Sequence, residues 1–316
     1  MNAFLLDDGR LRSGWRFGIS AVVVVIANFV AMIVAYGFAG NHARLLEVIY
    51  RPLLVILELG AFYLLTKLFD QPKQSVWQYN GLGRYRWFQE TLVGALLGFV
   101  LVGLAVGAIA LFFNLHIVSL RINVRTLTVG TVVFGVILAA AMAEELAFRG
   151  YPFQRLVEGM GPVGAILVLS ALFGAVHLQN PHVSDNRLVQ IAAFTNTLLI
   201  GIVLALAYLR TRALWFPFGL HFAWNAALGL FFGLPVSGTN DFSVIVHSRA
   251  VGPEWLLGGA YGIEAGFIGT LVILLGLLYV VFFVKAVQPV PEPQPTALDQ
   301  PPAPGIQFPS GTPADL

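Results

Sequence analysis

Long apolar stretches recur along this 316-residue chain and restrict the folds open to it more than any other feature. Residues 17–40 contain no charged side chain over 24 positions. A membrane-spanning helix needs roughly 20 apolar residues, and this stretch is too long for the core of a signal peptide, so we expect a retained anchor. Hydrophobic residues make up 58% of the chain and charged residues 11%, against about 45–50% and 25% in soluble domains. The sequence therefore predicts an all-α, polytopic membrane protein.

About eight such segments follow one another within a membrane domain predicted at residues 17–286, after a short segment 1–16. The second segment is the least uniformly apolar, because it carries Glu47, Arg51 and Glu58. The Pro-rich residues 287–316 lack apolar periodicity and are predicted to be a disordered tail. The predicted spans are 17–40, 45–66, 91–113, 127 onward, 163–177, 188–209, 213–232 and 262–284.

The distribution of basic residues predicts the orientation of these spans. Twelve of the 18 lysines and arginines fall on the side that holds both ends of the chain, which places both termini in the cytosol by the positive-inside rule. The compact loops favour a bacterial inner membrane. The net charge of +2 is too small to indicate nucleic acid as a partner, so the expected partners are bilayer lipids and a polypeptide. The absence of cysteine excludes disulfides, thiolate metal sites and cysteine nucleophiles.

Three short polar clusters interrupt the apolar second half of the chain. A charge at the centre of a spanning helix costs about 2.5–3.5 kcal/mol on insertion scales, so such clusters need an explanation. Two carboxylates, a guanidinium and two imidazoles are the groups that a hydrolase uses on a peptide bond. The clusters are Glu144-Glu145-x-x-x-Arg149, Phe173-x-x-x-His177 and His221-x-x-x-Asn225.

Helical spacing divides the first cluster into two roles. Residues four apart share a face of an α-helix, whereas adjacent residues diverge by about 100°. Glu145 and Arg149 are therefore expected to pair and support the structure, while Glu144 faces elsewhere and carries the chemistry. The alternative is a simple charge cluster at a helix end near the membrane boundary.

A turn signal at residues 159–162 relates the first cluster to the second. If the fourth helix continues beyond Arg149 and the chain bends at residue 160, Glu144 and His177 both lie roughly 24–26 Å from the bend. An antiparallel hairpin would then bring them to the same level. Phe173 shares a face with His177 and is expected to shield the imidazole from lipid.

The third cluster offers hydrogen-bond donors. His221 and Asn225 lie one turn apart on one helical face, and both can stabilise a developing oxyanion; the alternative is a polar contact between helices. Glu144, His177 and His221 could instead form a zinc site with a bound water, although the His-Glu-x-x-His motif is absent. Among the other polar residues, Glu58 is the best candidate for a second group in a cavity.

The three clusters, in this order on successive apolar segments, resemble the CPBP family, which groups type 2 CAAX-prenyl endopeptidases with bacteriocin-processing and immunity proteins. The resemblance covers about residues 130–230, with a family-like core at about 130–232. It implies eight helices around a conical intramembrane cavity, with Glu144 and His177 activating water and His221 and Asn225 stabilising the oxyanion. Glu145 and Arg149 would support Glu144. Both a metal-free glutamate mechanism and a metalloprotease mechanism are compatible with the resemblance.

These observations predict an intramembrane endopeptidase that hydrolyses a peptide bond in a membrane-associated or lipidated polypeptide. No cofactor is required on the glutamate mechanism, and zinc is the alternative. A different class remains open, namely a non-proteolytic bacteriocin-immunity or transport protein. Against transport, the chain shows no internal repeat and no pair of broken helices in corresponding halves.

Overall fold

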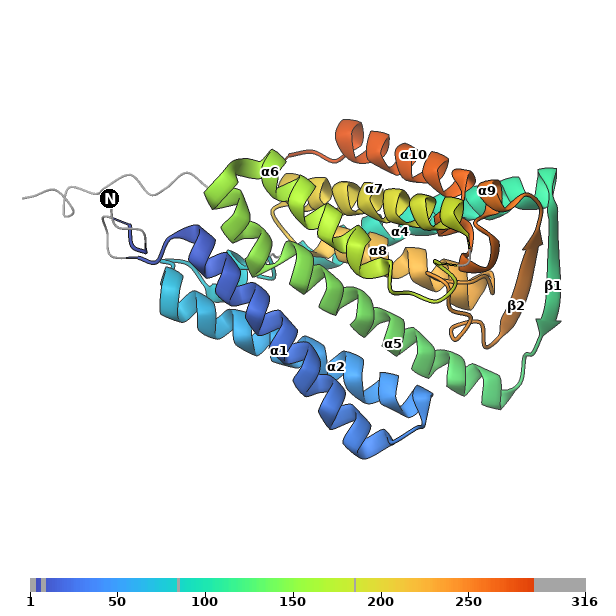
Figure 1. The fold of residues 1–316 in the computed structure, drawn as a ribbon, viewed down its shortest axis with the longest axis horizontal. Coiled ribbons are helices and arrows are strands. Elements are labelled where there is room, and N and C mark those ends of the chain that lie inside the picture. The colour runs from blue at the N-terminus through green and yellow to red at the C-terminus, as the bar shows by residue number, and fades with distance from the viewer. Residues whose placement is uncertain (1–3, 7–9, 84–85, 185, 287–316) are drawn as a thin grey trace, which may run out of the picture. The chain divides into compact units, whose positions relative to one another are not determined.

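A computed structural model describes residues 4–6, 10–83, 86–184 and 186–286 of the chain. It is mostly helical (Figure 1). The predicted disordered tail, 287–316, lies outside the described residues. The helices are α1 (Ser13–Ala39), α2 (Ala43–Leu65), α3 (Val76–Tyr79), α4 (Trp87–Phe112), α5 (Val124–Arg149), α6 (Tyr151–His177), α7 (Arg187–Thr211), α8 (Trp215–Ala226), α9 (Glu254–Leu257) and α10 (Phe267–Phe283).

Each predicted span coincides with a helix, but the count of eight membrane-spanning helices is not confirmed. Within the described residues, five helical stretches are long and apolar enough to cross a membrane, one of them running through α5 and α6. α10 is shorter, with 17 residues. α8 has 12 residues and continues into a π-helical turn at Ala227–Phe231. The protein is therefore an integral membrane protein in which α8 and α10 are shorter than full spans.

A two-stranded antiparallel sheet corrects the all-α prediction. β1 (Asn114–Leu120) pairs with β2 (Val246–Val251), and Asn114 lies opposite Val251 (Figure 1). Most of β1 is exposed, and its alternation of polar and apolar residues is interrupted between Ile117 and Ser119, which weakens the signal of a half-buried strand. Its partner also lies far away in the chain. A short helix, α9, follows β2 at Glu254–Leu257.

The turn between the first and second polar clusters also differs from the prediction. α5 ends at Arg149, because Gly150 leaves the helical region at φ −76° and ψ −137°. α6 then begins with Pro152 in its first turn, where the missing N–H costs nothing. A second break follows at Gly161, whose φ of 81° favours glycine. The chain therefore turns in two steps: the break at Gly161 confirms the turn predicted at 159–162, whereas the predicted continuation of the fourth helix beyond Arg149 is wrong.

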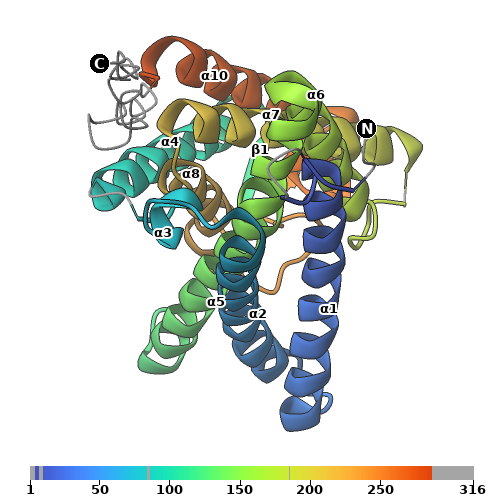
Figure 2. The same cartoon turned by 90° about the vertical axis from the view of Figure 1, so that its left-hand side faces the viewer.

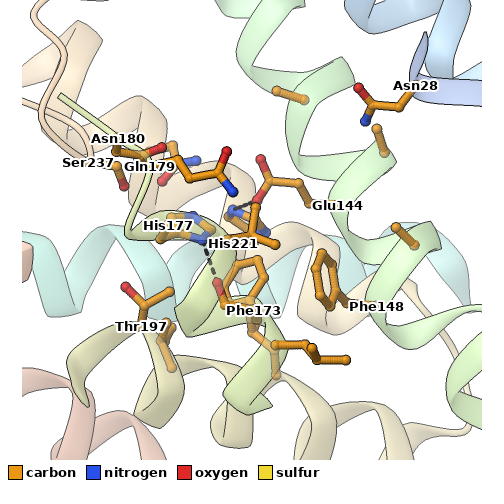
Figure 3. Close-up of a pocket in the computed structure, with 18 of the residues that line it drawn as sticks. Asn28, Glu144, Phe148, Phe173, His177, Gln179, Asn180, Thr197, His221 and Ser237 are labelled. Atoms are coloured by element: carbon orange, nitrogen blue, oxygen red, sulfur yellow. Dashed lines mark hydrogen bonds and ion pairs between the residues drawn. The ribbon is translucent and has the colours of Figure 1, made fainter. Parts of the chain in front are cut away.

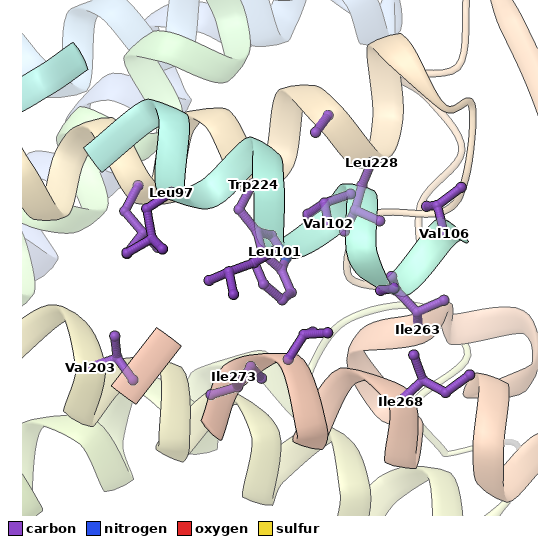
Figure 4. Packing of buried hydrophobic residues seen from close by; sticks show 14 of the residues in the cluster. Leu97, Leu101, Val102, Val106, Val203, Trp224, Leu228, Ile263, Ile268 and Ile273 are labelled. Atoms are coloured by element: carbon purple, nitrogen blue, oxygen red, sulfur yellow. The ribbon is translucent and has the colours of Figure 1, made fainter. Parts of the chain in front are cut away.

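Close backbone contact fixes α8 against α4. A methyl group added at Gly94 would lie 2.2 Å from the backbone oxygen of Phe216, and one at Gly98 would lie 2.4 Å from that of Leu220. Small residues four apart allow helices in a membrane to approach in this way. Figure 4 shows the adjoining core, in which Leu101 of α4 and Trp224 of α8 lie close to Ile273 of α10. α8 is therefore held along its length.

The N-terminal helices α1 and α2 form a wall on one side of the bundle. α1 and α2 lie side by side, and α2 packs on α5 (Figure 2). At one end, the buried carboxylate of Asp70 accepts hydrogen bonds from Arg16 of α1 and Arg155 of α6. Glu158 pairs with both guanidinium groups, at 3.0 and 2.8 Å. These four residues, the Asp70 cluster, join α1, the π-helical turn Thr66–Asp70 that follows α2, and α6.

Candidate active site

One pocket of about 900 Å³ lies between the pair formed by α1 and α2 and the helices α5, α6 and α8. The four residues predicted to be catalytic line it, as does Phe173, and they come from α5, α6 and α8 (Figure 3). The structure therefore brings together groups that stand up to 81 positions apart in the sequence. The predicted catalytic residues are Glu144, His177, His221 and Asn225.

Glu144 reaches the pocket from the second-to-last turn of α5. Its side chain is 29% exposed, and its Oε2 lies 3.6 Å from Nε2 of His221. Figure 3 shows the carboxylate pointing toward the two imidazoles. Glu144 thus projects from another face of α5 than Glu145, as predicted, and its carboxylate is partly exposed to the pocket.

Glu145 and Arg149 lie behind the pocket and are paired, as predicted. Arg149 Nη1 donates to Glu145 Oε1 at 3.0 Å, and both side chains are almost completely buried. Arg149 also donates to the carbonyl of Gly201 on α7 at 3.4 Å. Its guanidinium lies 4.5 Å from the centre of the Phe173 ring, a cation–π contact.

The same Glu145 oxygen holds His221 of α8. Nδ1 of His221 lies 2.8 Å from Glu145 Oε1. Because a carboxylate only accepts, Nδ1 must carry the proton of this bond, which leaves Nε2 directed toward Glu144. Glu144, Glu145, Arg149 and His221, here called the His221 cluster, thus connect α5 to α8. Asn225, one turn further along α8, lines the same pocket.

His177 stands at the last residue of α6 with its ring fixed at one nitrogen. Nδ1 lies 2.8 Å from the carbonyl oxygen of Phe173 (Figure 3). A carbonyl accepts but does not donate, so Nδ1 carries the proton and Nε2 of the neutral ring has a free lone pair. The ring centre of Phe173 lies 4.5 Å from that of His177 and 6.2 Å from that of His221. Phe173 therefore packs against both imidazoles.

The wall formed by α1 and α2 contributes polar groups that the motifs did not reveal. Arg51 lines the pocket, together with Tyr50 and Asn28, whose side chains are joined by a hydrogen bond of 2.8 Å. Glu58 lines it too, as predicted; it is 1% exposed, and its Oε2 has no hydrogen-bond partner among the described residues. The signal available in the sequence was the presence of charged residues in an otherwise apolar segment.

The zinc alternative at Glu144, His177 and His221 stays an alternative. Among the described residues, no group of three or more His, Asp or Glu side chains is arranged to hold a metal ion. Nδ1 of His221 is engaged by Glu145 and Nδ1 of His177 by a carbonyl.

Part of the chain resembles a known protein family. Residues 126–227 match the family model described as type II CAAX prenyl endopeptidase Rce1-like. This segment is Rce1-like. It runs from the first turn of α5 to the end of α8 and contains every predicted site residue, so the expected resemblance is confirmed over this part of the chain. No curated protein and no solved structure matches the chain.

The Rce1-like segment assigns the site to a protease family, and hence to hydrolases at the level of the family. α1, α2, α4 and α10 lie outside the matched residues. The pocket is thus built from an Rce1-like half and from helices that the family model does not cover. The individual roles of Glu144, His177, His221 and Asn225 stay predictions.

Proposed function

We propose that this protein is an intramembrane endopeptidase that hydrolyses a peptide bond in a membrane-associated or lipidated polypeptide. The observation that carries the proposal is the meeting of Glu144, His177 and His221 from three helices at one pocket, inside an Rce1-like segment. The pocket is the proposed catalytic cavity. The preferred location is a bacterial inner membrane, with both termini in the cytosol.

Glu144 and His177 activate the attacking water in this proposal. Glu144 takes a proton from the water as the oxygen attacks the carbonyl carbon of the substrate. Positioned general bases of this kind contribute typically about 10²–10⁴-fold to a rate. The free Nε2 of His177 accepts a hydrogen bond from the water and so orients it. This nitrogen then takes up the proton held by Glu144 and passes it to the leaving amine as the C–N bond breaks. The products are a new carboxylate and a new amine.

His221 and Asn225 receive the oxyanion of the tetrahedral intermediate. Asn225 can donate from its amide, and His221 can donate from Nε2 when that nitrogen is protonated as well as Nδ1. Donors fixed in advance are effective because they need no reorganisation during the reaction. Glu145, buried and paired with Arg149, holds the His221 ring in place through Nδ1.

Glu144→Gln tests the proposal. The protein is purified in lipid nanodiscs and given a quenched fluorescent peptide that carries a prenylated cysteine near its C-terminus. We expect kcat to fall by about 10³-fold or more while the thermal unfolding midpoint stays close to that of the wild type. Glu254→Gln, a matched change at an exposed site on α9, should cleave normally. Unchanged cleavage by Glu144→Gln would remove Glu144 from the mechanism.

The proposed chemistry uses no metal, and this part is tested separately. Elemental analysis of the purified protein is paired with cleavage assays in the presence of a chelator. We expect substoichiometric zinc and full activity after chelation. Zinc at one equivalent, together with activity that is lost on chelation and restored by zinc, would favour the metalloprotease alternative.

A further inference from the structure

Arg51 is the one lysine or arginine among the described residues that line the pocket, whose other charged side chains are Glu58, Glu144 and Glu264. It lies eight residues into α2, about 12 Å along an apolar helix. A charged side chain at such a depth is expensive and marks a functional site unless a partner compensates it. Arg51 therefore needs a partner of opposite charge.

The partner present in the chain uses one nitrogen of Arg51. Nε donates to Glu47 Oε2 at 2.7 Å, and the guanidinium lies 4.9 Å from the centre of the Tyr50 ring. The side chains of Arg51 and Glu47 are 28% and 38% exposed, and partly exposed pairs of this kind contribute about 0–1 kcal/mol. The two terminal nitrogens make no hydrogen bond to any other described side chain. The contacts with Glu47 and Tyr50 thus orient Arg51 and leave its two terminal nitrogens, the fork of the guanidinium, free.

The direction of α2 brings this fork to the catalytic region. Arg51, Leu54 and Glu58 are spaced along one face of α2, and all three line the pocket. α2 packs on α5, and the charges of Arg51 and Glu144 interact electrostatically. A planar guanidinium with two free N–H groups binds a carboxylate in bidentate fashion.

We propose that Arg51 binds a carboxylate of the polypeptide substrate and so selects chains that present a carboxylate close to the bond to be cleaved. This inference rests on the proposed endopeptidase function. The carboxylate has two sources, the C-terminus of the substrate or an acidic side chain, and both offer the same two oxygens to the fork.

The experiment combines substrate and protein changes. The probe is the prenylated peptide in three forms, with a free C-terminal carboxylate, with a C-terminal amide, and with an amide plus aspartate as the last residue. In wild-type protein, amidation should raise KM by about 10- to 100-fold, the range expected for hydrogen bonds to a charged group, with a smaller change in kcat. In Arg51→Gln, the acid and amide forms should have the same raised KM, because the group that distinguishes them is gone.

Two further variants separate charge from geometry. Arg51→Lys keeps the charge but loses the fork, so it should recover only part of the affinity. Arg44→Gln, at an exposed position on the same helix, should retain the discrimination between acid and amide. Recovery of KM by the aspartate form would identify side chains as an acceptable source, and no recovery would identify the C-terminus.

Binding to Glu144→Gln protein, measured with the same peptides, separates this inference from the proposed function. Carboxylate-dependent binding without cleavage by the wild type would overturn the endopeptidase but not the role of Arg51. Cleavage with equal KM for acid and amide would overturn the role of Arg51 alone, as would effects of amidation and Arg51→Gln that multiply independently. If Arg51→Gln does not fold, Arg51→Lys decides with the same peptides: a reduced difference in KM between acid and amide supports the role of Arg51, and an unchanged difference overturns it.

Discussion

Two buried charge clusters in this protein are built from the same groups and differ in what they leave open. The Asp70 cluster joins α1, the turn after α2 and α6, and the His221 cluster joins α5 to α8 and α7. Each has one fully buried carboxylate: Asp70 pairs with Arg16 and Arg155, and Glu145 pairs with Arg149. None of the Asp70 cluster residues lines the pocket, whereas the His221 cluster presents Glu144 and one edge of His221 to it. A buried charge thus has functional meaning here when an unused lone pair or N–H faces a cavity.

The difference also concerns the cost of losing a member. In the Asp70 cluster one carboxylate serves two buried guanidinium groups, so its removal leaves two cations poorly compensated. In the pocket, Glu144 is partly exposed and makes a single contact of 3.6 Å, so its removal disturbs little packing. We therefore expect stability effects in the first cluster and activity effects at the pocket. Three substitutions test this separation.

The largest effect is expected for His177→Ala, which removes a pocket group held by one hydrogen bond to a carbonyl. The water loses its orienting partner and the leaving amine its proton donor, so kcat should fall by about 10²–10⁴-fold. The unfolding midpoint should change little. Steady-state cleavage and thermal unfolding are measured together, with His116→Ala on the exposed β1 strand as the matched control. A variant that unfolds readily but retains its kcat would reverse the distinction between the clusters.

Asp70→Asn should produce the opposite result. Loss of the carboxylate leaves Arg16 and Arg155 with Glu158 alone, and removal of one member of a buried charge network typically costs about 3–5 kcal/mol. The free energy of unfolding should fall by that amount, while the kcat of the folded fraction stays near the wild-type value. Asp241→Asn, at an exposed loop position, should be nearly neutral. Loss of kcat without loss of stability would mean that the Asp70 cluster serves the reaction.

The sequence predicted the pocket residues well because their signal is local. Charged and polar side chains four apart, as in Glu145 and Arg149, can be recognised on a single helix, and apolar segments are the background against which they stand out. The pairing and the placement of Glu144 on another face followed from helical geometry alone. The Rce1-like match over 126–227 covers this same part of the chain.

The features that were missed depend on distant residues or on backbone detail. Arg16 and Arg155 are buried around Asp70, which their positions in the sequence do not reveal, because each has its partner far away in the chain. The β1–β2 pairing is likewise non-local. The helix break at Gly150 depends on how Tyr151 and Pro152 start the next helix, which spacing alone does not reveal.

Glu145 shares features with both Asp70 and the pocket residues. Glu145→Gln therefore gives the sharpest test of the comparison, although its expected effects are the smallest. It is as buried as Asp70 but also holds His221. The amide oxygen of glutamine can still accept one hydrogen bond, and Glu144 supplies a negative charge near Arg149, so the loss of stability should be about 1–3 kcal/mol. The His221 ring loses a charged partner and its fixed orientation, so kcat should also fall, by about tenfold. Measuring both quantities in one preparation, beside Asp70→Asn, shows whether they change together: a change in stability alone would place Glu145 with Asp70, and a change in kcat alone would place it with the pocket residues.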